Sequence, residues 1–121
     1  MAEIETLKML IDGAWCAASD GVSFDSMDPS TGKVWATIPE ATAADVNRAV
    51  DAAEAALEGA WGAMTATQRG KHLALLADLL AAHSEEIGQI ETRDTGKMFK
   101  ETAWQATYIA EYLHFFCGGC R

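Results

Sequence analysis

The sequence predicts an α+β fold in which two strand pairs come first and about four helices follow. Two observations carry this prediction. Short apolar runs separated by turn residues fill residues 1–40, and apolar residues recur with helical spacing across residues 41–121. Strands and helices do not alternate, so the layout taken alone is a partial α+β arrangement rather than a nucleotide-binding one. A chain of 121 residues is long enough to bury a core.

Residues 1–40 carry the turn signals of two strand pairs. The dipeptide Asp12-Gly13 separates residues 7–11 from residues 14–17 and predicts a hairpin with a two-residue turn. The segment Asp28-Pro29-Ser30-Thr31-Gly32 separates residues 24–27 from residues 34–38 and predicts a second strand pair. Proline presets the backbone angle that such a turn needs, and glycine supplies the positive one.

The first two helices are predicted from their N-terminal caps. Thr42 is followed by Asp45, and Thr65 is followed by Gln68, which is the spacing of a capping box. Each cap precedes apolar residues at helical spacing, and those of the first helix form one stripe: Val46, Ala49, Val50, Ala53 and Leu57.

Two more helices complete the expected layout. We expect Ser84 to cap a short third helix and Gly96 to end it, because glycine adopts the left-handed conformation of a helix stop. The fourth is expected from about Met98 to Phe116, with Gly118-Gly119 ending it.

Composition and charge exclude several classes of function. The formal net charge is −9 without a local basic stripe, which argues against nucleic-acid binding. No run approaches the roughly 18 apolar residues of a membrane span. The acidic N-terminus lacks the build of a secretory signal, so we expect a cytoplasmic protein with no membrane partner.

The three cysteines are expected to be reduced thiols. Cys117-Gly118-Gly119-Cys120, with His114 nearby, could indicate a redox pair or part of a zinc site. A thioredoxin-like pair needs a strand before it and a helix after it, whereas here a helix precedes it. We favour two ordinary cysteines at a helix exit. No G-x-G-x-x-G pattern is present, and we assign no catalytic and no cofactor-binding residue.

Aromatic residues crowd the last predicted helix. Trp104, Tyr108 and Tyr112 recur every fourth residue and share a face, and Phe115 and Phe116 follow. Ordinary core packing, a ligand tunnel and a surface for a partner are three interpretations of this helix.

Several motifs, taken in order, resemble the N-terminal part of the aldehyde dehydrogenase superfamily. They cover the chain from about Leu10 to Gly118 and are Ile11-Asp12-Gly13-Ala14-Trp15, Asp28-Pro29-Ser30-Thr31-Gly32, Asp45-Val46, Trp61 with Arg69, and Glu91-Thr92 with Asp94-Thr95-Gly96-Lys97. The chain departs from the family at Cys117-Gly118-Gly119-Cys120, where an Ala-Gly-Trp-Ala-type exit is common.

The resemblance implies the α/β, Rossmann-like fold of that family. Residues 1–121 would be the N-terminal portion of its dinucleotide-binding domain, without the catalytic and oligomerisation parts. It also implies an enzyme that oxidises an aldehyde to a carboxylic acid with NAD or NADP, and a homo-oligomer at full length. A cysteine nucleophile, a water-activating glutamate and the cofactor glycines lie further along in the family. We therefore expect this chain to bind no cofactor and to be inactive by itself.

The resemblance also implies a few site residues. Some relatives bind a structural sodium or potassium ion through positions that match the backbone oxygens of Ser26 and Met27 and the carboxylate of Asp94. Trp104 and Tyr108 match positions that line the substrate entrance. A stand-alone helical interaction module, which would use the aromatic last helix, remains the alternative function. The identity of the aldehyde and the choice between NAD and NADP stay open.

Overall fold

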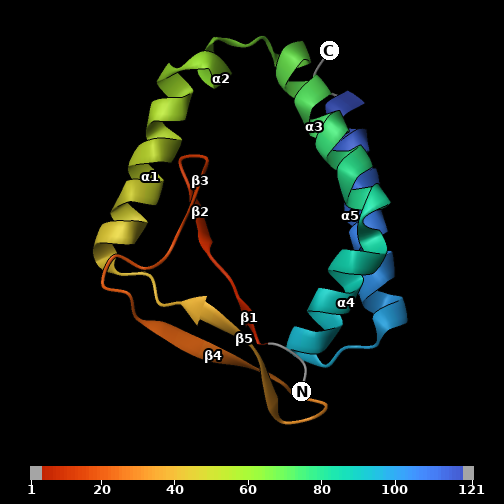
Figure 1. Cartoon of the computed structure of the whole chain (residues 1–121). Helices are drawn as coiled ribbons and strands as arrows, with labels where there is room; N and C mark the ends of the chain where they lie inside the picture. Colours follow the sequence, from red (N-terminus) through yellow and green to blue (C-terminus); the bar gives the residue numbers. More distant parts are fainter. Residues whose placement is uncertain (1–3, 119–121) are drawn as a thin grey trace. The chain divides into compact units, whose positions relative to one another are not determined.

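The computed structural model describes residues 4–118 and divides the chain into two compact units, Met1–Ala63 and Met64–Arg121. The described strands and two helices, α1 and α2, lie in the first unit, and the three helices α3, α4 and α5 build the second (Figure 1). Each unit has its own small core, so each is described by itself.

A three-stranded sheet in the first unit is built around β5 (Lys33–Pro39), which lies between β1 (Glu5–Thr6) and β4 (Ser23–Asp28). β4 runs antiparallel to β5, whereas β1 runs parallel to it. Trp35 and Ala36 of β5 are buried. A separate hairpin is formed by β2 (Met9–Ile11) and β3 (Ala14–Cys16).

The turns that join these strands follow from their residues. Asp12 and Gly13 both have positive φ, 51° and 72°, as a two-residue hairpin turn requires. In the turn between β4 and β5, the Ser30 backbone N–H donates to Asp28 Oδ1 at 2.7 Å, and Gly32 has a φ of 66°. The Ser30 bond is the main cause that lowers the pKa of Asp28 below its ordinary value.

A buried carboxylate organises the start of α1 (Ala43–Glu58). Asp45 Oδ2 accepts hydrogen bonds from the backbone N–H groups of Ser19 at 3.1 Å and Thr42 at 2.9 Å. Arg48 donates to its other oxygen at 2.7 Å. The backbone donors, with the Thr42 hydroxyl and Arg48, hold the pKa of Asp45 well below its usual range. Asp45 therefore ties the segment after β3 to the helix N-terminus.

The apolar stripe of α1 is largely exposed. Val46, Val50 and Leu57 are 52%, 53% and 67% exposed. Part of the stripe borders a groove of about 410 Å³ between α1 and β2, which is lined by Met9, Leu10, Ile11, Ala41, Asp45, Val46, Ala49, Val50 and Ala53. A short helix, α2 (Ala60–Ala63), follows α1.

The second unit consists of α3 (Ala66–Ala82), α4 (Ser84–Thr95) and α5 (Phe99–Gly118). α5 packs along both α3 and α4, as Figure 1 shows. The buried face of α5 carries Thr102, Ala106 and Ala110. Small side chains at these positions allow the helices to approach closely.

α4 and α5 approach each other closely at Gly88. A Cβ atom there would lie 2.7 Å from both the Cα and N atoms of Ala103, so the site admits only glycine without movement. The Thr102 hydroxyl donates to the Gly88 carbonyl oxygen at 2.8 Å and lies 2.8 Å from Thr92 Oγ1. Thr102 is fully buried and thus joins the two helices through polar contacts.

The expected fold class is confirmed, and so are several local details. Both hairpins form, and Thr42 and Thr65 each make a complete capping box. Gly96 ends α4 in the left-handed conformation with a φ of 75°. The last helix begins at Phe99, one residue after the expected start, and is described to Gly118, whereas Gly119 lies outside the described residues.

The cap expected at Ser84 is wrong. Ser84 is the first residue of α4, and His83 occupies the N-cap position without a side-chain cap hydrogen bond. His83 also follows the last residue of α3, so it serves as the C-cap of α3 and the N-cap of α4. Ser84 therefore lies inside α4 and cannot take the N-cap position, which needs a non-helical backbone conformation. β1 and α2 are further elements that the sequence pattern did not predict.

Candidate functional site

The exposed side of α5 carries a continuous row of aromatic rings. We call it the aromatic row and define it as Trp104, Tyr108, Tyr112, Phe115 and Phe116. Trp104 and Tyr108 are stacked, with ring centroids 4.9 Å apart and planes 16° apart. Tyr108 meets Tyr112 edge to face at 4.9 Å. The ring centroids of Tyr112 and Phe116 are 6.3 Å apart, and those of Phe115 and Phe116 are 5.3 Å apart.

The helix period explains why this row faces outwards. Buried Thr102, Ala106 and Ala110 precede Trp104, Tyr108 and Tyr112 by two positions each, and two helical residues turn the side-chain direction by roughly 200°. The rings are consequently 41% to 77% exposed. The aromatic row therefore does not form the core of the second unit, which was one of the three interpretations of this helix.

Within the row, the two tyrosines interact through their hydroxyl groups. Tyr108 Oη donates to Tyr112 Oη at 3.3 Å. This hydrogen bond and the neighbouring Tyr112 raise the pKa of Tyr108 above its ordinary value, so Tyr108 is neutral at physiological pH. The row offers an uncharged apolar and aromatic surface, which suits contact with an apolar or aromatic group.

The residues expected to bind a cation lie in different units. Ser26 and Met27 are neighbours on β4 at an irregularity in the ladder, where Ser26 pairs with Ala36 and Met27 pairs with Val34. Asp94 is the penultimate residue of α4 and is exposed. The donor types, two backbone carbonyls and a carboxylate, are hard oxygens that suit sodium or potassium. The site itself stays a prediction.

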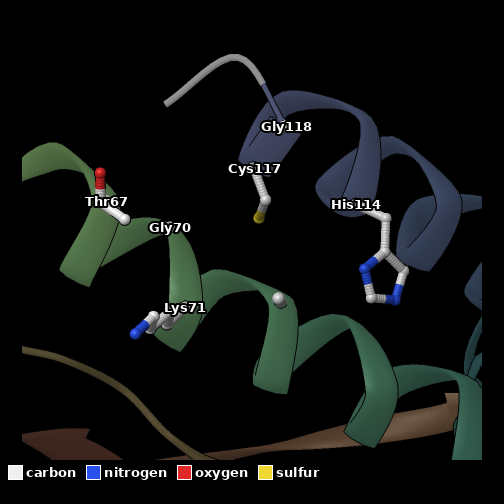
Figure 2. Close-up of a pocket in the computed structure, with 7 residues that line it drawn as sticks. Thr67, Gly70, Lys71, His114, Cys117 and Gly118 are labelled. Atoms are coloured by element: carbon white, nitrogen blue, oxygen red, sulfur yellow. The ribbon is translucent and has the colours of Figure 1, made fainter. Parts of the chain in front are cut away.

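A pocket of about 310 Å³ lies between α3 and α5. Figure 2 shows Cys117 and His114 of α5 pointing toward α3, whose Thr67, Gly70 and Lys71 line the opposite wall. Cys117 is a half-buried free thiol, and His114 Nε2 lies 3.1 Å from Asp78 Oδ1.

The Cys117-Gly118-Gly119-Cys120 segment falls partly outside the described residues, because Gly119 and Cys120 are not among them. Within residues 4–118, no three His, Cys, Asp or Glu side chains gather into a group that could hold a metal ion. The interpretation of Cys117 and Cys120 as ordinary cysteines therefore stays a prediction.

Reasoning from the sequence did not connect α3 to this pocket. Thr67, Gly70, Lys71 and Ala74 follow one another at helical spacing, which places them on one face of α3. That spacing was the available signal. The face of α5 that forms the other wall of the pocket could not be inferred, because the local sequence does not indicate which helix packs against α3.

The sequence matches the model of the aldehyde dehydrogenase family over residues 15–121. The chain therefore belongs to the aldehyde dehydrogenase family. A curated relative from Acinetobacter baylyi, (Z)-2-((N-methylformamido)methylene)-5-hydroxybutyrolactone dehydrogenase, is 44% identical over 117 residues. The match covers 95% of this chain and 23% of the relative.

Solved structures of the family have the same fold over this segment. The NAD-dependent aldehyde dehydrogenase of Sinorhizobium meliloti is similar with a TM-score of 0.91 and 32% identity over 97% of this chain and 24% of that structure. The aldehyde dehydrogenase of Bacillus cereus in its NAD⁺ complex is similar with a TM-score of 0.90 and 34% identity, covering 94% and 24%. The chain thus spans about a quarter of the length of these relatives.

None of the helices in residues 4–118 is both long and apolar enough to cross a membrane.

Proposed function

We propose that this chain is the N-terminal part of a cytoplasmic oxidoreductase that oxidises an aldehyde to a carboxylic acid with NAD or NADP. The observation that carries the proposal is the match of 95% of the chain to 23% of a curated dehydrogenase. Similar structures from Sinorhizobium meliloti and Bacillus cereus support NAD as the cofactor, since one is NAD-dependent and the other holds NAD⁺. The whole enzyme would be a homo-oligomer, and residues 1–121 would belong to its dinucleotide-binding domain.

In this proposal the 121-residue chain has no dehydrogenase activity by itself. None of its three cysteines lies in the motif of the family's nucleophile, and no dinucleotide-binding glycine pattern occurs in it. The test is aldehyde-dependent NAD or NADP reduction, followed by NADH or NADPH absorbance with a panel of aliphatic and aromatic aldehydes. Turnover by the purified chain would overturn this part of the proposal.

Trp104 and Tyr108 would form part of the wall of the substrate entrance in the whole enzyme. Their stacked, exposed rings support contact with an apolar or aromatic aldehyde. In a whole enzyme that contains this segment, Trp104→Ala should raise KM for an aromatic aldehyde more than for acetaldehyde. An equal effect on both aldehydes would argue for a purely structural role of Trp104.

Ser26, Met27 and Asp94 would contribute oxygens to a structural sodium or potassium ion in the whole enzyme. Relatives supply further ligands from later sequence, so the isolated chain is expected to bind no cation. Its melting temperature should be the same in sodium, potassium and choline chloride. A sodium- or potassium-specific increase that Asp94→Asn removes would show that this segment binds the ion alone.

A second function is favoured by the exposure of the aromatic row, which fits a helical interaction module. The DNA sequence directly after the Arg121 codon separates the two functions. An open frame that continues into a dinucleotide-binding domain supports the dehydrogenase. A stop codon at that point supports the interaction module.

A further inference from the structure

α5 contacts α4 near its start and α3 near its end, as Figure 1 shows. Gly88 of α4 meets Ala103, the residue directly before Trp104. Near the other end of α5, His114 Nε2 lies 3.1 Å from Asp78 Oδ1 of α3. The part of α5 that carries Trp104 is therefore placed by its contacts with α4, and both helices belong to the second unit.

Two kinds of contact fix the distance between α4 and α5 at this level. At Gly88 the helices meet through backbone atoms, since a Cβ there would lie 2.7 Å from the Cα atom of Ala103. Beside this point, the buried Thr102 hydroxyl donates to the Gly88 carbonyl oxygen at 2.8 Å. Thr92 Oγ1 lies 2.8 Å from the same Thr102 oxygen and adds a second polar link. We call these four residues the α4–α5 contact.

We propose that the α4–α5 contact positions the Trp104 ring at the substrate entrance, so that Gly88 and Thr102 help to determine which aldehydes the whole enzyme accepts. This inference rests on the proposed function, because it uses the substrate entrance to which Trp104 would belong. It deepens that function by assigning positioning residues that do not touch the substrate themselves. Gly88 and Thr102 are buried between the two helices, so their contact does not depend on what covers the outer face of α5.

A change in the α4–α5 contact reaches Trp104 through the backbone of α5. Closely packed helices respond to an added methyl group by shifting, because protein interiors compress very little. The rings of Trp104 and Tyr108 are stacked 4.9 Å apart on this helix, so a shift of α5 carries both rings together. Aromatic groups bind each other in preferred offset or edge-to-face geometries, whereas acetaldehyde has no ring to align. The contact should therefore affect aromatic aldehydes selectively.

The first test is Gly88→Ala in a whole enzyme that contains this segment. The variant should raise KM for benzaldehyde by about three- to tenfold and leave kcat within about twofold, because a displaced ring weakens binding rather than chemistry. KM for acetaldehyde should change by less than about twofold. Gly118→Ala is the matched control, because its Cβ meets open space. It should leave both KM values within about twofold of the parent.

A double-mutant cycle shows whether Gly88 acts through Trp104. In the Trp104→Ala background, Gly88→Ala should change KM for benzaldehyde by less than about twofold, because the ring that it displaces is already absent. An equal increase of KM in both backgrounds would overturn the proposal, since Gly88 would then act by another route.

Two variants of Thr102 separate positioning from general stability. Thr102→Val keeps the shape but removes the hydroxyl group, so KM for benzaldehyde should rise as it does in Gly88→Ala. Thr102→Ser keeps the hydroxyl group and should stay within about twofold of the parent. Far-UV circular dichroism at the assay temperature shows that each variant is folded.

The outcomes distinguish this inference from the proposed function. Folded variants that lose activity equally toward both aldehydes, or that leave both KM values unchanged, would overturn the positioning role of Gly88 and Thr102 alone. A parent enzyme that oxidises neither aldehyde with NAD or NADP would refute the proposed function, and this inference would fall with it.

Discussion

Among single residues, Asp45 and Thr102 are the fully buried polar side chains of the described structure, one in each unit. Burying a polar group is costly unless it is hydrogen-bonded, and both residues have several partners. Each is therefore expected to be necessary for its own unit.

Replacing Asp45 with Asn should destabilise the first unit in a pH-dependent way. The fold lowers the pKa of Asp45 from its ordinary value of 3.8, so the folded state takes up a proton less readily than the unfolded state. The stabilisation is fully present above about pH 4 and is lost as the pH falls through the folded pKa. In urea unfolding, Asp45→Asn should lower the midpoint at pH 7, and the difference should shrink below pH 4.

Asp51→Asn on the same helix is the control for this prediction, because Asp51 is exposed. It should leave the urea midpoint nearly unchanged. A difference between the parent chain and Asp45→Asn that stays constant from pH 7 to pH 3 would contradict the electrostatic explanation.

Thr102→Val should destabilise the second unit by about 1–3 kcal/mol, because the Gly88 carbonyl and Thr92 hydroxyl lose a buried partner. Valine keeps the shape of threonine, so the loss reports the hydroxyl group. Thr107→Val is the control: Thr107 is exposed, and a change below about 0.5 kcal/mol is expected. Equal unfolding free energies for both variants would contradict the role of Thr102.

At the scale of elements, the contact between α4 and α5 depends on the missing side chain at Gly88. Alanine there would place its Cβ 2.7 Å from the Ala103 backbone, so the helices must separate. Although alanine favours an isolated helix, we expect Gly88→Ala to cost about 1–3 kcal/mol in thermal or urea unfolding. Gly118→Ala has open space around its Cβ and should be neutral or stabilising. A stabilised Gly88→Ala variant would disprove the close approach.

The elements also separate what local sequence can predict from what it cannot. The capping boxes at Thr42 and Thr65 are confirmed because each needs only two residues three positions apart. The cap at Ser84 was wrong because side-chain type does not reveal that α3 and α4 share His83. β1 was missed because Glu5 and Thr6 become a strand only through β5, some 30 residues away.

At the scale of the whole molecule, each compact unit should respond to its own substitutions. Hydrogen exchange measured peptide by peptide should show that Asp45→Asn lowers protection within residues 4–63. Thr102→Val should lower it within residues 64–118, since substitutions in separate compact units that share no contact partners act independently. Loss of protection in α5 on changing Asp45 would contradict this division.

Residues of the candidate site that share one helix could be predicted from the sequence, whereas residues that lie in different units could not. Trp104 and Tyr108 share one helix, so their spacing alone placed them on one face, and the structure brings their rings into contact. Ser26 and Met27 lie in one unit and Asp94 in the other, and no local pattern can supply the distance between them. The prediction that Ser26, Met27 and Asp94 bind one ion came from the family resemblance and could not have come from the chemistry of the residues alone.

The parallel pairing of β1 with β5 has a consequence for the order of folding. β4 and β5 are joined by a short turn, so they can pair within microseconds, whereas β1 must first close a loop of about 30 residues. β1 is then held by only two ladder residues, Glu5 and Thr6, and by a hydrogen bond from the Leu7 backbone N–H to the Thr37 carbonyl oxygen at 3.0 Å. We expect β1 to dock last during folding and to detach first during unfolding. A protease added to the native protein should therefore cut near Leu7 before it cuts within β4 or β5.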